Sequence, residues 1–206
     1  MPTLTYSSKL PSPAEDVFAW HNRDGALYRL LPPWAPVRVE QFEGVRDGQR
    51  AELRIGPGPL SVRWVAEHHD WVEGRQFCDR QVQGPFAAWD HIHRFEPSED
   101  GGSTLIDQIE YTPPAGALGE TLAPSLLEPE LGRQFAYRHR ITRRDLDLHE
   151  RYNPDGTART VAVSGSSGLV GTQLCALLST SEPSVSLLYC ESCVCVCAIQ
   201  FHIKMQ

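Results

Sequence analysis

The chain has 206 residues, 41% of them hydrophobic, and a formal net charge of −7, which bounds it to one globular domain or little more. The acidic balance argues against nucleic-acid binding, which usually requires a basic surface. No apolar run approaches the ~20 residues of a membrane span, and Met1–Leu4 shows no signal-peptide pattern. We therefore expect a cytoplasmic protein without nucleic-acid or membrane partners.

The first elements in chain order are a strand and two short helices. Residues 3–9 alternate between apolar and polar side chains, which predicts a strand. A helix is expected next, with Ser12 as its N-cap and Pro13 at its first position. A second helix is expected from Gly25 to Leu31, before two prolines.

Residues 37–112 follow period two, and turns rich in glycine and proline interrupt the pattern. Short spacers favour antiparallel neighbours, because a parallel crossover needs a dozen residues or more. The six strands predicted here are Val37–Phe42, Ala51–Ile55, Leu60–Glu67, Arg75–Val82, Ala87–Phe95 and Ser103–Tyr111.

A long amphipathic helix is predicted from Leu126 to Tyr152, ending at an Asn-Pro-Asp-Gly stretch. Its apolar face matches the open face of a seven-stranded antiparallel sheet, so the two should pack and can enclose a cavity. We expect the basic run within this helix to be a solvated face rather than an anion site. That run consists of Arg138, His139, Arg140, Arg143 and Arg144.

A glycine motif follows the helix. An apolar run over residues 161–163 leads into Gly165, Gly168 and Gly171, and Leu174–Leu178 continues at helical pitch. This order is typical of the first strand, phosphate-binding turn and first helix of a dinucleotide-binding fold. Only 35 residues follow Gly171, so we expect an incomplete Rossmann βα unit.

The last residues are rich in cysteine. A cluster of four could bind a soft metal, but structural zinc sites usually pair two such clips and a second clip is missing, so no metal is expected. The composition changes abruptly after Leu178, which suggests a shifted reading frame or an altered gene end. The four cysteines are Cys190, Cys193, Cys195 and Cys197.

The element order, together with the residues from Gly84 to Phe95 and from Asp107 to Pro113, resembles the START-like superfamily (SRPBCC, polyketide cyclase-like). The resemblance implies an α+β helix-grip fold with a seven-stranded antiparallel sheet around a long C-terminal helix. The stretch VAVSGSSGLVG that follows resembles the start of an NAD-dependent epimerase, or atypical short-chain dehydrogenase, fused to such a module.

These resemblances divide the chain into three parts. We expect a START-like ligand-binding domain over residues 1–155, an incomplete dinucleotide-binding unit over 156–178 and an atypical Cys-rich tail over 179–206. The dehydrogenase family also needs a Tyr-x-x-x-Lys pair, which this sequence lacks. Gly165, Gly168 and Gly171 are thus a vestigial cofactor site, and NAD or NADP is implied only for a complete relative.

Strand phase predicts the cavity. His91 and His93 share one face with Trp89, and Asp107 shares a face with Tyr111 on the next strand. The more aromatic face is chosen as concave because apolar area drives helix docking. The six residues expected to line one cavity under the long helix are Trp64, Trp89, His91, His93, Asp107 and Tyr111.

Other readings of these residues stay open. The histidines can simply form hydrogen bonds within the core or face solvent. Alternatively, His91, His93 and Asp107 can bind a metal, although a fourth ligand is not evident. The leading hypothesis is non-covalent binding of a small apolar ligand, with no catalytic residue assigned. The alternatives are a cyclase or hydratase that uses the histidines for proton transfer, an NAD(P)-dependent epimerase or oxidoreductase, and an interaction module with a filled core.

Overall fold

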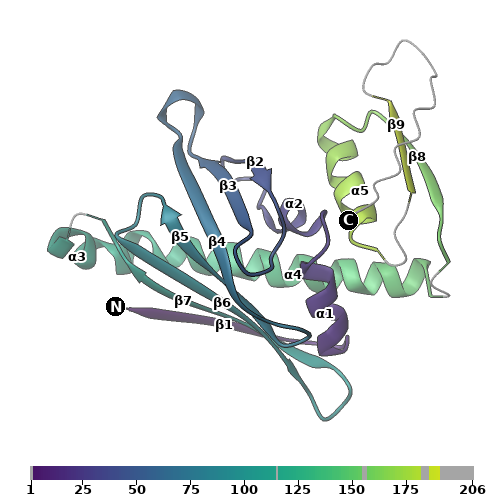
Figure 1. The fold of residues 1–206 in the computed structure, drawn as a ribbon, viewed down its shortest axis with the longest axis horizontal. Helices are drawn as coiled ribbons and strands as arrows, with labels where there is room; N and C mark the ends of the chain where they lie inside the picture. Colours follow the sequence, from purple (N-terminus) through teal and green to yellow (C-terminus); the bar gives the residue numbers. More distant parts are fainter. Residues whose placement is uncertain (1, 115, 155–156, 182–185, 191–206) are drawn as a thin grey trace.

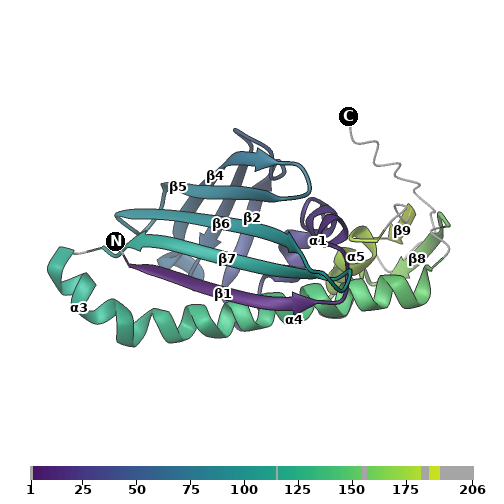
Figure 2. The ribbon, with the colours of Figure 1, turned by 90° about the horizontal axis from the view of Figure 1, so that it is seen from below.

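The computed structural model describes residues 2–114, 116–154, 157–181 and 186–190. The predicted α+β helix-grip fold is confirmed, because a seven-stranded antiparallel sheet curves over one long helix (Figures 1 and 2). The elements before the long helix are β1 (Thr3–Leu10), α1 (Ala14–His21), α2 (Ala26–Leu30), β2 (Val37–Phe42), β3 (Arg50–Ile55), the 3-10 helix η1 (Gly58–Leu60), β4 (Val62–Val72), β5 (Gln76–Gln83), β6 (Ala88–Pro97), β7 (Ser103–Thr112) and α3 (Gly116–Leu126). The long helix α4 (Glu128–Tyr152) is followed by β8 (Thr160–Ser164), α5 (Leu169–Ser179) and β9 (Ser186–Cys190).

The strand order of the large sheet is β1-β7-β6-β5-β4-β3-β2. Five consecutive hairpins connect β2 through β7, as the short spacers predict. The first strand pairs with the last one, and α1 and α2 carry the chain from that edge to the opposite edge. The sheet therefore stays open between β1 and β2, and α4 lies along its concave side (Figure 2).

The buried face of α4 repeats every three or four residues. Leu131, Phe135, His139, Thr142 and Leu146 are all buried along this face, as expected for an amphipathic helix on a sheet. The ring of Phe135 stacks on Tyr6 of β1 at a centroid distance of 4.8 Å. Burial of such a ring contributes about 1.5–3 kcal/mol, so this face holds α4 against the sheet.

The core has two apolar clusters, one at each end of the concave face. The first contains Phe18 and Trp20 of α1 with Phe77 and Phe95 of the sheet. The second lies near the start of α4 and contains Trp89, Tyr111 and Phe135 among its members. Buried histidine and aspartate side chains, described below, lie between these two clusters.

Two local expectations were wrong, and one helix was not expected. Pro13 rather than Ser12 occupies the N-cap position of α1, in an extended conformation with φ −55° and ψ 150°, and no side chain caps this helix. Strand β4 runs to Val72, five residues beyond the expected end. The segment after Pro114 forms α3, which apolar periodicity did not reveal because it contains two glycines and Pro124.

The C-terminal unit, defined here as β8, α5 and β9, is more complete than expected. Strand β9 pairs in parallel with β8, from Thr160 opposite Ser186 to Ser164 opposite Cys190. The unit is therefore a βαβ crossover, and its second strand lies in the region that the sequence analysis assigned to the tail. The cysteines at 193, 195 and 197 lie outside the described residues.

The C-terminal unit docks on the helix-grip domain through α2. Arg29 of α2 donates a hydrogen bond to Gln173 Oε1 of α5 at 2.9 Å. A Cβ atom on Gly25 would lie 2.0 Å from the carbonyl oxygen of Ala176, so only glycine permits this approach. His149 Nε2 of α4 forms a further hydrogen bond with Thr180 Oγ1 at 2.9 Å.

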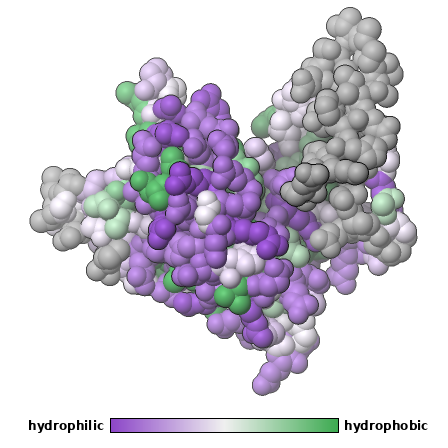
Figure 3. Space-filling view, viewed as in Figure 1, coloured by the Kyte–Doolittle hydropathy of each residue, from purple (hydrophilic) through white to green (hydrophobic). Residues whose placement is uncertain are grey.

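The outer surface of the domain is largely hydrophilic in the view of Figure 3. Glu67 of β4 pairs there with Arg50 of β3 and Arg80 of β5, at 2.7 and 2.8 Å. Exposed pairs of this kind contribute little stability, about 0–1 kcal/mol each. None of the helices in the described part of the chain combines the length and apolar character that crossing a lipid bilayer requires.

Candidate functional site

A cavity of about 580 Å³ lies between the concave face of the sheet and α4. Its volume is within the range of small-molecule sites, about 300–1,000 Å³. Most of the lining is apolar, and the segment after α2 closes one side. Representative apolar lining residues are Leu30, Leu53, Ile55, Trp64, Ala66, Phe77, Phe86, Trp89, Leu131 and Phe135.

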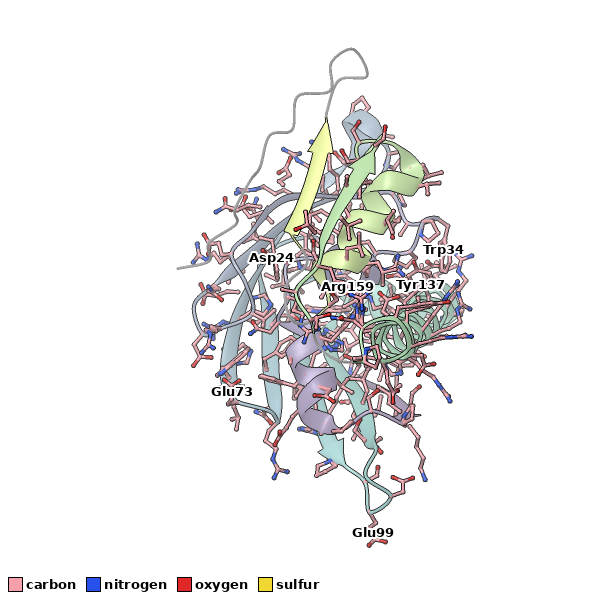
Figure 4. The ribbon with its side chains drawn as sticks, turned by 90° about the vertical axis from the view of Figure 1, so that its right-hand side faces the viewer. Asp24, Trp34, Glu73, Glu99, Tyr137 and Arg159 are labelled. Atoms are coloured by element: carbon pink, nitrogen blue, oxygen red, sulfur yellow. The ribbon has the colours of Figure 1, made fainter. Side chains whose placement is uncertain are left out.

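Aromatic rings form one wall of this cavity. Trp64 meets Trp89 edge to face at a centroid distance of 5.2 Å, and both rings pack against Phe86. On the opposite side, Trp34 lies at 5.2 Å from Tyr137 of α4, and Figure 4 shows these two side chains next to each other, far from the hairpin tip at Glu99. Edge-to-face packing favours well-defined ring positions, so the cavity has fixed walls.

Four of the six expected site residues line this cavity: Trp64, Trp89, His91 and His93. Asp107 and Tyr111 are not among its lining residues. Asp107 is only 3% exposed and lies behind the two histidines, whereas Tyr111 lines a separate pocket with Pro113 and Glu128. Asp107 and Tyr111 share one face of β7, but they are four residues apart and four strand residues span about 13 Å. The shared face therefore did not bring them into one cavity.

A histidine–aspartate cluster, which we define as Asp79, His91, His93, Asp107 and His139, lies at the polar end of the cavity. Asp107 is its centre. His91 Nε2 donates to Asp107 Oδ1 at 2.9 Å, and His139 Nε2 donates to Oδ2 at 2.6 Å. His93 Nδ1 lies 2.7 Å from Oδ1, although the contact lacks the alignment of a hydrogen bond.

A second carboxylate faces the same two rings from the other side. Asp79 Oδ2 lies 3.2 Å from His91 Nδ1 and 3.4 Å from His93 Nε2. Both rings are therefore held between the buried carboxylate of Asp107 and the partly buried carboxylate of Asp79. The strand register brings these groups together, because Asp79 pairs with His91 and His93 pairs with Asp107.

The electrostatics of the cluster favour positive charge. Burial alone would lower the pKa of His91, but hydrogen bonds to Asp107 and Asp79 raise it to about 9. Burial alone would raise the pKa of Asp107, but the charge of His93 and hydrogen bonds from the histidines hold it well below its usual range. The pKa of Asp79 is likewise well below its usual range, despite burial, through its bonds to His91 and His93.

In contrast to His91, three neighbouring basic side chains have lowered pKa values. Burial lowers the pKa of His21 to about 3, although its Nδ1–H donates to the Val17 carbonyl at 2.7 Å. Burial also lowers the pKa of His68 and that of Arg138. Arg138 packs its guanidinium 4.9 Å from the Phe135 ring, and its Nε has no hydrogen-bond partner. An unpaired buried donor at the cavity wall can meet an acceptor on a ligand.

The sequence analysis did not place Asp79, Arg138 or His139 in this site. Asp79 is in strand phase with Phe77, and His139 lies four residues after Phe135 on the buried face of α4. The sequence shows on which face of its strand or helix each of these residues lies. His139 was nevertheless assigned to the solvated face because it stands among arginines. The expectation of a solvated run is right for Arg140, Arg143 and Arg144, which are exposed, and wrong for His139, which is buried, and for Arg138, which lines the cavity.

The glycine motif forms a compact turn before α5. Gly165 has φ +73°, a conformation that favours glycine, and Gly168 is the N-cap of α5. A Cβ atom on Gly171 would lie 2.0 Å from the carbonyl oxygen of Gly165. The start of α5 therefore packs closely against this turn and leaves no room for a side chain at Gly171.

Comparisons with known proteins identify relatives of both the helix-grip domain and the longer chain. Residues 10–134 match the family model "Polyketide cyclase / dehydrase and lipid transport". The comparison with curated proteins returned no match. Among solved structures, a nucleoside-diphosphate sugar epimerase from Corynebacterium glutamicum is 33% identical, with a TM-score of 0.69. That match covers 90% of this chain, and the chain spans 39% of the epimerase.

Two more distant structures share the fold. The Zhui aromatase/cyclase from Streptomyces sp. R1128 is 16% identical, with a TM-score of 0.57 and coverage of 76% of this chain and 99% of that one. Norcoclaurine synthase from Thalictrum flavum is 12% identical, with a TM-score of 0.54 and coverage of 71% and 87%. At these identities the likeness concerns the fold alone.

Proposed function

The chain belongs to the polyketide cyclase/dehydrase and lipid transport family, and we propose that its helix-grip cavity binds a small, largely apolar ligand with one polar end. The observation that carries this proposal is the uneven lining of the cavity. Aromatic and aliphatic side chains form most of the wall, while Asp79, His91, His93 and Arg138 contribute one polar group to it and Glu130, Arg133 and Gln134 of α4 contribute another. A few fixed polar groups in an apolar cavity orient a ligand.

The apolar part of such a ligand would lie against Trp64, Trp89 and Phe86. Burial of apolar surface provides the driving force, about 25 cal/mol per Å². At the polar end, the free Nε of Arg138 would donate to an oxygen atom of the ligand. The expected ligand is therefore an aromatic or polyketide-like molecule that carries a carbonyl, hydroxyl or acidic group.

Cavity filling tests this proposal. We expect the dye 8-anilinonaphthalene-1-sulfonate, an aromatic anion, to bind the protein and gain fluorescence. Ala66 lines the cavity, so Ala66→Phe should weaken binding at least tenfold, because the new ring occupies the dye's space. Ala88 lies on the opposite face of the sheet, in phase with Asp90, and Ala88→Phe should leave binding within twofold. Equal dye affinity in Ala66→Phe and the unaltered protein would exclude the cavity as the binding site.

A second candidate function concerns the C-terminal unit. Residues 1–155 of 206 cannot account for a match over 90% of the chain, so the likeness to the epimerase extends into the glycine turn or beyond it. This supports the proposal that the unit begins a dinucleotide-binding domain in a longer epimerase-like protein. The described residues form a single βαβ crossover, whereas the pockets for adenosine and nicotinamide need further strands.

This chain alone is therefore expected not to bind NAD or NADP with useful affinity. Isothermal titration calorimetry with each nucleotide checks this. Micromolar binding would show that the turn at Gly165, Gly168 and Gly171 is a functional site rather than a vestigial one.

A further inference from the structure

We propose that Asp79, His91 and His93 form a binding site for one divalent transition-metal ion whose open coordination positions face the cavity. The proposal replaces Asp107, the carboxylate considered from the sequence, by Asp79. It does not depend on the apolar ligand, because the donors are all side chains of the protein.

The spacing of the donor atoms carries the argument. Asp79 Oδ2 lies 3.2 Å from His91 Nδ1 and 3.4 Å from His93 Nε2, and the three atoms all lie within 4.8 Å of one another. Adjacent donors around an ion at about 2.0–2.2 Å must be about 3.0–3.5 Å apart. Two of the three edges therefore already have the length that a coordination shell requires.

The opposite nitrogen of each ring lies close to a second carboxylate, that of Asp107, and the nitrogen of His91 forms a hydrogen bond with it. His91 Nε2 donates to Asp107 at 2.9 Å, and His93 Nδ1 lies 2.7 Å from the same oxygen. His139 and, behind it, Ser8 hold the other side of Asp107 in place. Metal-binding histidines almost always donate their remote N–H to such a partner, which fixes the tautomer and the ring orientation.

Charge also favours a cation at this point. Asp79 and Asp107 bring two carboxylates into a buried region, and Arg138 is the guanidinium whose charge is coupled to both of them. A divalent ion between Asp79 and the two rings would take the place of a proton on His91 and offset the same negative charge, so that both imidazoles bind the ion in their neutral form. Buried carboxylates without such compensation are costly.

The donor set indicates the kind of metal. Two imidazoles and one carboxylate suit Zn²⁺ or Fe²⁺, and a site with three protein ligands keeps positions open for water or a ligand oxygen. All three residues line the cavity. An oxygen at the polar end of a bound molecule could therefore complete the coordination shell.

The chain contains two rival sites for added metal. His69, Asp70 and Cys78 have donor atoms close to one another, but Asp70 is 71% exposed. The four tail cysteines could also bind metal. We therefore choose full-length protein with these four cysteines changed to serine as the background for every variant, and His69→Gln as the matched control.

The experiment is a titration of chelator-treated protein with Zn²⁺ by calorimetry and with Co²⁺ by visible absorption. We expect one equivalent of each ion, with cobalt d–d bands and without the thiolate charge-transfer bands of a cysteine site. Asp79→Asn should weaken Zn²⁺ binding at least 100-fold, and Asp107→Asn should weaken it about 10–100-fold with unchanged stoichiometry. His69→Gln should bind as the background does.

Two results would overturn the proposal: a folded background protein that binds neither ion, or Asp79→Asn that binds Zn²⁺ as tightly as the background. If Asp79→Asn does not fold, His93→Gln replaces it under the same criterion. Dye binding by these variants is measured in parallel, so a loss of metal binding with retained dye binding separates this proposal from the cavity function.

Discussion

The helix-grip domain and the C-terminal unit contrast in how they bury their apolar surface. In the helix-grip domain, Trp20, Tyr111 and Phe135 are almost fully buried because sheet and helices cover each other. In the C-terminal unit, Leu169 and Val170 at the start of α5 are 84% and 78% exposed. Both regions form regular local elements, but only the first supplies a complete second layer. Local sequence signals thus specify elements, and stability requires a partner for each apolar face.

Helix α2 is where the two regions meet. Arg29 binds Asp145 of α4 through two hydrogen bonds of 2.7 Å and also donates to Gln173 of α5. Leu27 and Leu30 of the same helix line the cavity. The cavity and the C-terminal unit are therefore separated by one short helix.

The largest expected effect comes from separating the two regions. A chain ending at Asp155 should keep one cooperative unfolding transition, with a midpoint lower by about 2–8 °C for the loss of about 1–2 kcal/mol of docking contacts. The isolated segment 157–206 should show no cooperative transition. Circular dichroism during heating measures both. Loss of the transition in the first fragment would show that the helix-grip domain depends on the C-terminal unit.

A smaller effect is expected from Gly25→Ala. The added methyl group overlaps the Ala176 carbonyl, so urea unfolding of the full chain should show a loss of about 1 kcal/mol, at most the whole contribution of docking. Gly132→Ala is the matched control, because its methyl group meets only Tyr6 at 3.8 Å, and it should gain about 0.5–1 kcal/mol.

The truncated chain sharpens this test. Ala176 is absent from residues 1–155, so Gly25→Ala should be close to neutral there. An equal loss in both chains would mean that Gly25 acts within α2 and not through the docking of α5.

The smallest effect concerns pH and His149. Burial lowers the pKa of His149 to about 4, so the unfolded chain binds a proton more readily than the folded chain between about pH 6.5 and 4. Stability contributed by the neutral ring is therefore present above pH 6.5 and is lost as the pH falls through this window. Because the ring is partly exposed, solvent screening limits the loss to about 1 kcal/mol.

Urea unfolding of the protein and of His149→Gln at pH 7 and pH 5 measures this contribution. The variant should lack it, so the difference between the two proteins should shrink at pH 5. In the chain ending at Asp155, which lacks Thr180, the contribution of His149 should also decrease. A pH response that is identical in both proteins would contradict the assignment to His149.

The sequence determined much of the fold because periodicity is a local property. Period two identified all strands of the large sheet, the larger aromatic area identified the buried face of β6, and the glycine spacing identified the turn before α5. The sequence analysis failed where the type of neighbouring residue was given more weight than the apolar periodicity. The arginines beside His139 concealed its place on the buried face, and the glycines and Pro124 concealed α3.

The composition of the candidate site was decided by tertiary structure. Phase states which face of an element a residue occupies, but not its position along the sheet or its neighbour on the next strand. Register brought Asp79 opposite His91 and Asp107 opposite His93, and α4 added His139 from a distant part of the chain. The same register placed Tyr111 about 13 Å along β7 from Asp107, in another pocket. Periodicity was thus sufficient for the sheet and the helix, whereas strand register and the docking of α4 created the histidine–aspartate cluster.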